Sequence, residues 1–335
     1  MCRNKKNISG CLRRFLHKQE LSSHIKMQAI QTPSVTMTRS LLDLPPELLS
    51  QILESLPVQA LLRFSQTSRL ARTLANSNLH TLNLAIKPIC GRAANDYCEQ
   101  RNCIRIPDAS TYDYGVLLQF HNALLVSVVT RHAVMLRTLD LSLWTLTTPI
   151  AEVISTLFAL RDLSIKVEDD LYARSVPRSS IALEKKEQNK AWDLLGLGAV
   201  WKPRLRRFKI QNADLTTAQL RKLLEHSRYC EEIWLGGCRF IDKDVWVFLG
   251  HEWEGRSTLQ RLHVAHCGFL IEEKSLEAIS GLTGLQSLNI QGCHAQGDGV
   301  VEHWNQQVWH IPYLIPPKHV DDPHDSAIEV DPDYL

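Results

Sequence analysis

The sequence predicts an α/β protein in which a small helical unit is followed by a series of stacked strand–helix units. Three observations predict this arrangement. Residues 41–77 are rich in leucine at helical spacing, apolar triplets recur along most of the remaining chain, and cysteine follows three successive triplets at the same position. With 335 residues, of which 44% are apolar, the chain is long enough to bury a core and to form more than one structural unit.

The helical unit divides into three short segments. Pro45-Pro46 suits a first helical turn, Pro57 separates the first helix from the second, and a third helix is expected from Ser68 to about Ala75. One side of the first helix carries its apolar residues, Leu48, Leu49, Ile52, Leu53 and Leu56. Three helices this short bury too little surface by themselves, so part of their apolar surface is expected to meet another chain or domain.

The order of residues in this unit is specific. It reads Leu44-Pro45-x-Glu47-Leu48, Ile52-Leu53-x-x-Leu56, Leu61-Leu62-x-Phe64 and Ser68-Arg69-x-x-Arg72. In this it resembles the F-box family, with departures at Thr67, where cysteine is common, and at Leu74, where an aromatic residue is common. The resemblance implies docking onto the Skp adaptor and, through it, onto the cullin and RING subunits of a ubiquitin ligase. The residues that it implies for adaptor contact are Leu44, Pro45, Leu48, Ile52, Leu56, Leu61 and Phe64. Leu53 and Leu62 fit the core of the unit equally well, and a helical hairpin that only caps the next domain is the alternative.

Apolar triplets with the spacing LxxLxL recur along the rest of the chain. They are Leu79-Leu82-Leu84, Leu136-Leu139-Leu141, Leu160-Leu163-Ile165, Leu205-Phe208-Ile210, Cys230-Ile233-Leu235, Leu259-Leu262-Val264 and Leu285-Leu288-Ile290. Their first residues lie 57, 24, 45, 25, 29 and 26 positions apart. Most intervals fall near the period of about 20–29 residues that leucine-rich repeats use. The two long intervals indicate repeats with insertions.

Three successive triplets are followed, three residues after their last apolar position, by Cys238, Cys267 and Cys293. In this the chain resembles cysteine-containing leucine-rich repeats, and with the helical unit it resembles the fungal-type F-box family with such repeats. The fold expected is a three-helix F-box followed by an irregular leucine-rich-repeat solenoid, a horseshoe of α/β class. The periodic cysteines are expected to pack in a column and to bind no metal.

The remaining cysteine cluster also predicts no metal site. Cys90, Cys98, Cys103 and His121 match no spacing that zinc sites commonly use, so inert loop or packing thiols are expected. No glycine-rich phosphate loop, GxSxG or HExxH is present, and no cofactor or enzymatic reaction is predicted.

The domain organisation expected from composition has four parts. Residues 1–40 form a disordered basic tail, residues 41–77 the F-box, residues 78–310 the repeats with inserts near 88–114 and 167–203, and residues 311–335 an acidic, proline-containing tail. Repeat helices are expected at 116–135, 216–225 and 272–279. The 167–203 insert is expected to be a solvated surface loop that ends in a possible helix containing Lys185, Lys186, Lys190 and Trp192, with a partner-binding loop as the alternative.

Composition excludes several classes of function. A net charge of +2 and 7% aromatic residues argue against a nucleic-acid-binding protein, and no apolar run approaches the roughly 20 residues of a membrane helix. Nine cysteines and the lack of a secretory signal favour a reducing compartment, the cytoplasm or the nucleus. The basic N-terminal tail leaves a mitochondrial address as the alternative.

The expected function is that of the substrate-recognition subunit of an SCF-type cullin–RING ubiquitin ligase. Residues between the apolar positions of each strand should point outward onto the concave sheet, where an unidentified protein substrate would bind. The predicted substrate-binding residues are Arg207, Lys209, Trp234, Arg261 and His263, because Trp and Arg often dominate interfaces. Trp234 is expected to be exposed among these residues, and the alternative is a merely solvated strand face with one covered Trp. For the whole chain, the alternative is an interaction scaffold that binds the Skp adaptor without forming a ligase.

Overall fold

The computed structural model describes residues 41, 44–54, 56, 58–88, 103–106, 112–167, 178–295 and 299–317. The chain divides into two compact units, residues 1–44 and 45–335. Of the first unit only Leu41 and Leu44 are described, and the Leu44 N–H donates to the Leu41 carbonyl at 3.3 Å. In the described ranges, no helix has the length and apolar character needed to cross a membrane.

The second unit begins with three short helices, α2 (Pro46–Glu54), α3 (Val58–Ser65) and α4 (Arg69–Ser77). Ser68 caps α4, because its side-chain oxygen accepts the Ala71 N–H at 3.0 Å. The helices enclose a small core of their own, formed by Leu53, Leu61, Ala75 and Leu79 with Leu56, Phe64 and Leu74 packed against it. This core is separate from the large core beneath the sheet.

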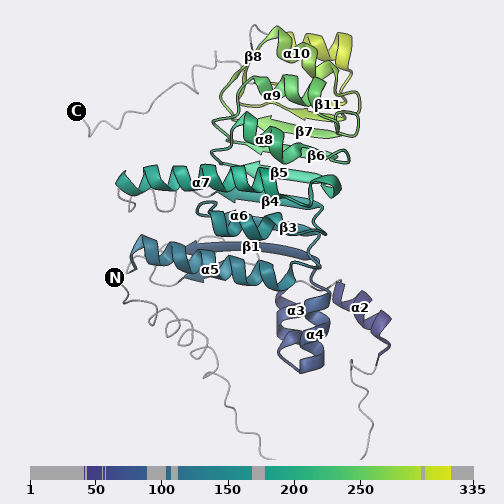
Figure 1. Ribbon diagram of the computed structural model, residues 1–335. Helices are drawn as coiled ribbons and strands as arrows, with labels where there is room; N and C mark the ends of the chain where they lie inside the picture. The colour runs from purple at the N-terminus through teal and green to yellow at the C-terminus, as the bar shows by residue number, and fades with distance from the viewer. Residues whose placement is uncertain are drawn as a thin grey trace, which may run out of the picture. The chain divides into compact units, whose positions relative to one another are not determined.

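The rest of the unit is built on a parallel sheet. In spatial order its nine strands are β11-β9-β7-β6-β5-β4-β3-β1-β2. Their bounds are β1 (Thr81–Pro88), β2 (Cys103–Ile106), β3 (Thr138–Leu143), β4 (Asp162–Val167), β5 (Arg207–Gln211), β6 (Glu232–Gly236), β7 (Arg261–Ala265), β9 (Ser287–Asn289) and β11 (Tyr313–Ile315). From β3 onward the strands therefore lie side by side in chain order (Figure 1). A second, two-stranded sheet pairs β8 (Leu270–Ile271) with β10 (His294–Ala295).

Helices between the strands cover one face of this sheet (Figure 1). They are α5 (Tyr114–His132), α6 (Thr148–Ser155), α7 (Arg178–Gly198), α8 (Thr217–Leu224), α9 (Asp244–Val247), α10 (Glu273–Ser280) and α11 (Val300–Trp304), with the short segments η5 (Lys202–Arg204), η6 (Phe248–Glu252) and η7 (Asn305–Trp309). Helices α5 to α8 pack against one another in chain order. The described part of the chain is thus a mixed α/β structure with ten α-helices and a parallel sheet.

The predicted triplets form the centre of the core. Every residue of the seven triplets is buried, none more than 7% exposed, and each triplet places two residues in or beside one strand of the sheet. Along β3 the burial alternates, with Leu139, Leu141 and Leu143 facing the helices. The period of two in a strand explains why the intervening residues face the other side.

A repeated turn follows the strands β5, β6, β7 and β9. Each turn contains a residue with a left-handed backbone, and the turn after β7 has a second one, Gly268. The residues that come first are Asn212, Gly237, His266 and Gly292. In the last three turns the next residue is cysteine, and all three cysteines are buried. The thiol of Cys238 lies 3.8 Å from the Ile210 carbonyl oxygen, that of Cys267 3.8 Å from that of Leu235, and that of Cys293 3.2 Å from that of Val264. Each thiol therefore reaches back to the last apolar residue of the preceding triplet, which ties successive turns together.

These thiols should be chemically inert in the folded protein. Burial raises the pKa of Cys238 and Cys293 to about 12 and that of Cys267 to about 11. At pH 8 a thiol with a pKa of 12 is ionised in about one molecule in ten thousand. We expect N-ethylmaleimide to leave all three unmodified in the native protein and to modify all three in 8 M urea, as read by mass spectrometry. Rapid labelling of Cys267 without denaturant would contradict its place in the core.

Two of the predicted parts contain more regular structure than expected. The possible helix at the end of the 167–203 insert is α7, which packs between α6 and α8, and η5 follows it. Trp192 in α7 and Trp201 just before η5 are fully buried, so this part of the insert is not a surface loop. The sheet also continues into the expected C-terminal tail, since β11 pairs in register with β9. In the other predicted insert, near 88–114, β2 adds an edge strand beside β1. The predicted tail of residues 1–40 lies outside the described residues.

Candidate functional site

Helix α2 exposes apolar side chains on one side. Leu48 is 46% exposed and Ile52 36% exposed, although they lie one turn apart on the same side of the helix. Leu49 and Leu53, on the adjacent side, are buried at 3% and 0%. Exposed leucine and isoleucine four residues apart on a short helix form a surface that suits a partner protein. In the first unit Leu44 is also exposed, and Pro45 is exposed at the start of the second.

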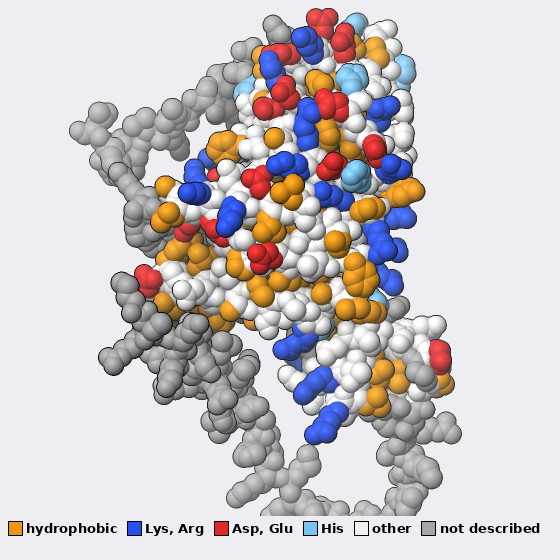
Figure 2. Space-filling model, viewed as in Figure 1, with side chains coloured by type: hydrophobic (Ala, Val, Ile, Leu, Met, Phe, Trp, Pro, Cys, Tyr) orange, Lys and Arg blue, Asp and Glu red, His pale blue; other side chains and the backbone are white. Residues whose placement is uncertain are grey.

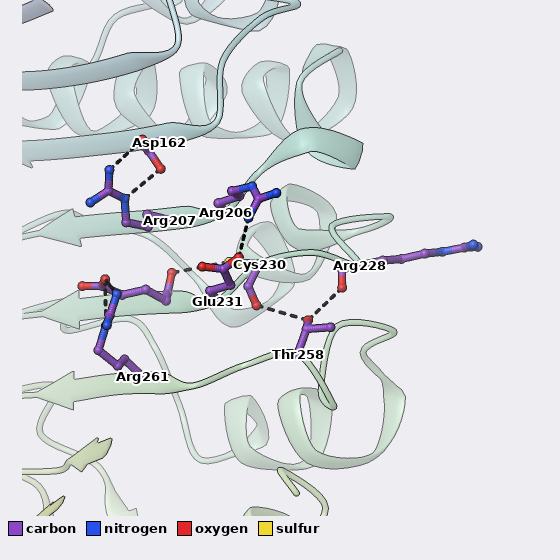
Figure 3. A network of polar contacts seen from close by, with 9 residues as sticks. Asp162, Arg206, Arg207, Arg228, Cys230, Glu231, Thr258 and Arg261 are labelled. Carbon is purple, nitrogen blue, oxygen red and sulfur yellow. Dashed lines mark hydrogen bonds and ion pairs between the residues drawn. The ribbon is translucent and has the colours of Figure 1, made fainter. Parts of the chain in front are cut away.

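The open face of the sheet carries a row of alternating charge. Asp162, Arg207, Glu232 and Arg261 occupy matching positions on the neighbouring strands β4 to β7. Arg207 donates two hydrogen bonds of 2.8 Å to the two carboxylate oxygens of Asp162. Arg261 donates bonds of 3.0 and 2.8 Å to one carboxylate oxygen of Glu232 (Figure 3). Two of the predicted substrate-binding residues are therefore already paired with acidic side chains.

Asp162 is held in its charged form. Partial burial alone would raise its pKa, but hydrogen bonds from Arg207 and from the Thr138 hydroxyl, the latter 2.9 Å long, hold the pKa below its ordinary value. The pair is complete at neutral pH and is lost only as the pH falls through this lowered pKa. At neutral pH the charge of Arg207 is therefore already balanced by Asp162 before any partner binds.

The next row along the same face contains the other three predicted residues. Lys209, Trp234 and His263 are neighbours in register on β5, β6 and β7. The Lys209 ammonium lies 4.4 Å from the centre of the Trp234 ring, and the His263 ring stacks on the other side at 3.7 Å with an angle of 15°. The Trp234 ring lies half-buried between these two side chains and is not fully exposed, which agrees with the alternative of a covered tryptophan.

The row presents one cation and two aromatic rings. Burial, followed by the charges of Lys209 and His266, lowers the pKa of His263 to about 4, so its imidazole is neutral at physiological pH. The Trp234 Nε1–H is buried, and no described residue accepts a hydrogen bond from it. Lys209, Trp234 and His263, here called the stacked row, thus offer an ammonium group and flat apolar surface. These groups suit recognition of a protein segment.

The described residues contain no group of three or more His, Cys, Asp or Glu side chains placed to hold a metal ion. Of the cysteine cluster considered in the sequence, Cys90 and Cys98 lie outside the described residues. His121 is buried and stacks on Trp144 with ring centres 4.7 Å apart. Burial lowers the pKa of His121 to about 4, as expected for a neutral core histidine.

Comparison with family models decides the nature of the helical unit. Residues 41–82 match the F-box domain. The match spans α2, α3 and α4 and reaches the first residues of β1. F-box domains bind the Skp adaptor in SCF ubiquitin ligases, and proteins that contain one are generally adaptors and not enzymes. A search of curated proteins found no match to this chain.

Within the F-box, the structure separates the predicted contact residues into two groups. Leu48 and Ile52 are exposed, whereas Leu61 is only 5% exposed and belongs to the core with Leu53. Leu61 is enclosed by the three helices, so the structure assigns it to the F-box core, and its contact with the adaptor stays a prediction. Leu56 and Phe64 are half-buried against the same core. The side chain of Leu62 lies outside the described residues.

Proposed function

We propose that this chain is the substrate-recognition subunit of an SCF-type cullin–RING ubiquitin ligase. The observation that carries the proposal is the exposed pair Leu48 and Ile52 on the first helix of a matched F-box domain. Burying these side chains in a groove of the Skp adaptor removes apolar surface from water. We also place Leu44 and Pro45 in this interface, from the sequence pattern.

The sheet region is proposed to be an irregular leucine-rich-repeat solenoid that binds the substrate. Seven buried triplets, strands in chain order and the column of buried cysteines support this assignment. The open face of the sheet is the proposed substrate surface. Its stacked row supplies the anchor, while Arg207 and Arg261 with their acidic partners form a polar border. Ubiquitin transfer by other subunits then depends on holding a substrate lysine near them.

Affinity purification of the tagged full-length chain tests this proposal. We expect the Skp adaptor and a cullin to co-purify, and we expect Trp234→Ala to lose one or more bound proteins while it retains both subunits. Gln211→Ala, on the same face of β5, is the matched control. Recovery of the adaptor without any cullin would favour the scaffold function, and an unchanged set of bound proteins in Trp234→Ala would place the substrate elsewhere. We further propose a cytoplasmic or nuclear location, which fluorescence imaging of the tagged chain tests.

A further inference from the structure

Three arginines occupy one position in three successive units of the sheet. Arg137, Arg161 and Arg206 immediately precede β3, β4 and β5. The Arg161 N–H donates to the Arg137 carbonyl at 2.7 Å, and the Arg206 N–H donates to the Arg161 carbonyl at 2.7 Å. Adjacent strands lie about 4.8 Å apart. The three residues, here called the arginine column, therefore follow one another across the N-terminal ends of the strands.

The arginine column is exposed, and two of its three guanidinium groups form no ion pair with a described residue. Figure 2 shows Lys and Arg side chains gathered along the right-hand margin, where the strands of Figure 1 begin. Arg206 forms an ion pair of 2.6 Å with Glu231 (Figure 3). For Arg137 and Arg161 the described residues provide no ion pair. Arg161 contributes to the lowered pKa of Asp162, but the hydrogen bonds of that carboxylate go to Arg207 and Thr138, and Glu232 is bonded to Arg261.

This arrangement does not stabilise the fold. Like charges directly opposite each other on adjacent strands are destabilising, and exposed side chains at the strand ends contribute little packing. At the same position the later units carry Glu231, Gln260 and Gln286, so the repeat itself does not require arginine there. An anion bound between Arg137 and Arg161 would remove their repulsion.

We propose that the arginine column binds a carboxylate-rich segment of a protein. A guanidinium group donates paired hydrogen bonds to the two oxygens of a carboxylate, and successive acidic side chains of one segment can bind successive arginines. A nucleic acid fits less well, because the three column residues offer no aromatic ring on which a base could stack and the net charge of the chain is only +2. This inference rests on the proposed function only in identifying the bound segment as part of the substrate.

The test measures binding of a fluorescein-labelled decapeptide of alternating Glu and Ser by anisotropy in 50 mM salt. Residues 321–335 contain six acids and no Lys or Arg, so the chain's own tail has the same chemistry as the probe. Each measurement is therefore made on the full-length chain and on a full-length variant whose six tail acids are replaced by their amides. We expect binding in at least one of these backgrounds, and weaker binding as salt is raised to 500 mM.

The double variant Arg137→Glu/Arg161→Glu should weaken binding at least tenfold. The control Lys185→Glu/Lys186→Glu changes the net charge equally on exposed positions of α7 and should retain binding within twofold. A peptide with Gln in place of Glu should not bind. Three outcomes would overturn the proposal. The peptide could fail to bind in both backgrounds, or the two double variants could lose binding equally. A labelled decauridylate could also bind more tightly than the peptide in a way that depends on the arginines. The Arg137→Glu/Arg161→Glu variant should still co-purify with the adaptor and the cullin. Loss of peptide binding alone therefore tests the arginine column, whereas loss of both subunits from the wild-type chain would contradict the proposed ligase function.

Discussion

Replacing Leu48 and Ile52 together by aspartate should reduce binding of the Skp adaptor by more than about a hundredfold. Each substitution places a charge in a contact from which water is excluded, at a cost of several kcal/mol, and about 1.4 kcal/mol corresponds to a factor of ten. Both side chains are exposed in the free chain, so their replacement leaves the F-box core of Leu53, Leu61, Ala75 and Leu79 intact. Isothermal titration calorimetry with purified adaptor measures the change.

The matched control adds two charges to the same domain at exposed polar positions, as Gln51→Asp/Thr73→Asp. It should keep adaptor affinity within a few-fold. Thermal unfolding of both double variants, followed by circular dichroism, should remain within a few degrees of the wild type, because neither removes a buried contact. Wild-type affinity in the Leu48→Asp/Ile52→Asp variant would show that α2 does not face the adaptor.

The sequence was sufficient to predict the core of the sheet region because burial there follows a short period. A side chain such as Leu139 or Leu262 is buried by its position within one strand, and that position is visible in a window of six residues. Helix α8 was predictable because its start also has a local signal. Thr216 and Gln219 form a capping box there, within four residues of the chain.

The chemistry of the open face was only partly predictable. The residues that point outward followed from alternation, but the pairing of Arg207 with Asp162 joins positions 45 residues apart. The aligned triplets place the two residues at matching positions, but their pairing also requires β4 and β5 to be neighbours in the sheet. The arginine column was missed because only the apolar positions of the triplets were compared, although Arg137, Arg161 and Arg206 each follow the first leucine of a triplet directly. Aligning the triplets and comparing the columns between apolar positions would have revealed it.

The sequence pattern also could not predict which apolar residues of the F-box are exposed. Leu53 and Leu61 are buried while Leu48 and Ile52 are exposed, yet all four are apolar and recur at helical spacing. Which side of each helix meets its neighbours depends on the angles between three helices. Those angles are set by packing over the whole domain and have no short signature in the chain.

The contact between the last helices depends on glycine. Gly250 in η6 is buried, and a Cβ atom added to it would overlap the backbone carbonyl of Ala278 in α10. Gly281, just after α10, approaches the carbonyl of Gly250 in the same way. Backbone meets backbone here, so no side-chain rotation can relieve the overlap. Only a shift of α10 away from η6 would make room for a methyl group.

Gly250→Ala should therefore destabilise the sheet region by about 3 kcal/mol, at the upper end of what overpacking costs. For a domain of this size that lowers the midpoint of thermal unfolding by roughly 6–12 °C. Gly198→Ala is the matched control, because a methyl group there makes only ordinary contacts with Ser155 at 3.6 Å, and its midpoint should stay near that of the wild type. Because the F-box has a separate core, Gly250→Ala should still bind the Skp adaptor at a temperature where the sheet region has begun to unfold. Equal unfolding midpoints for the two alanine variants, measured by differential scanning calorimetry, would show that η6 and α10 are not packed as closely as described.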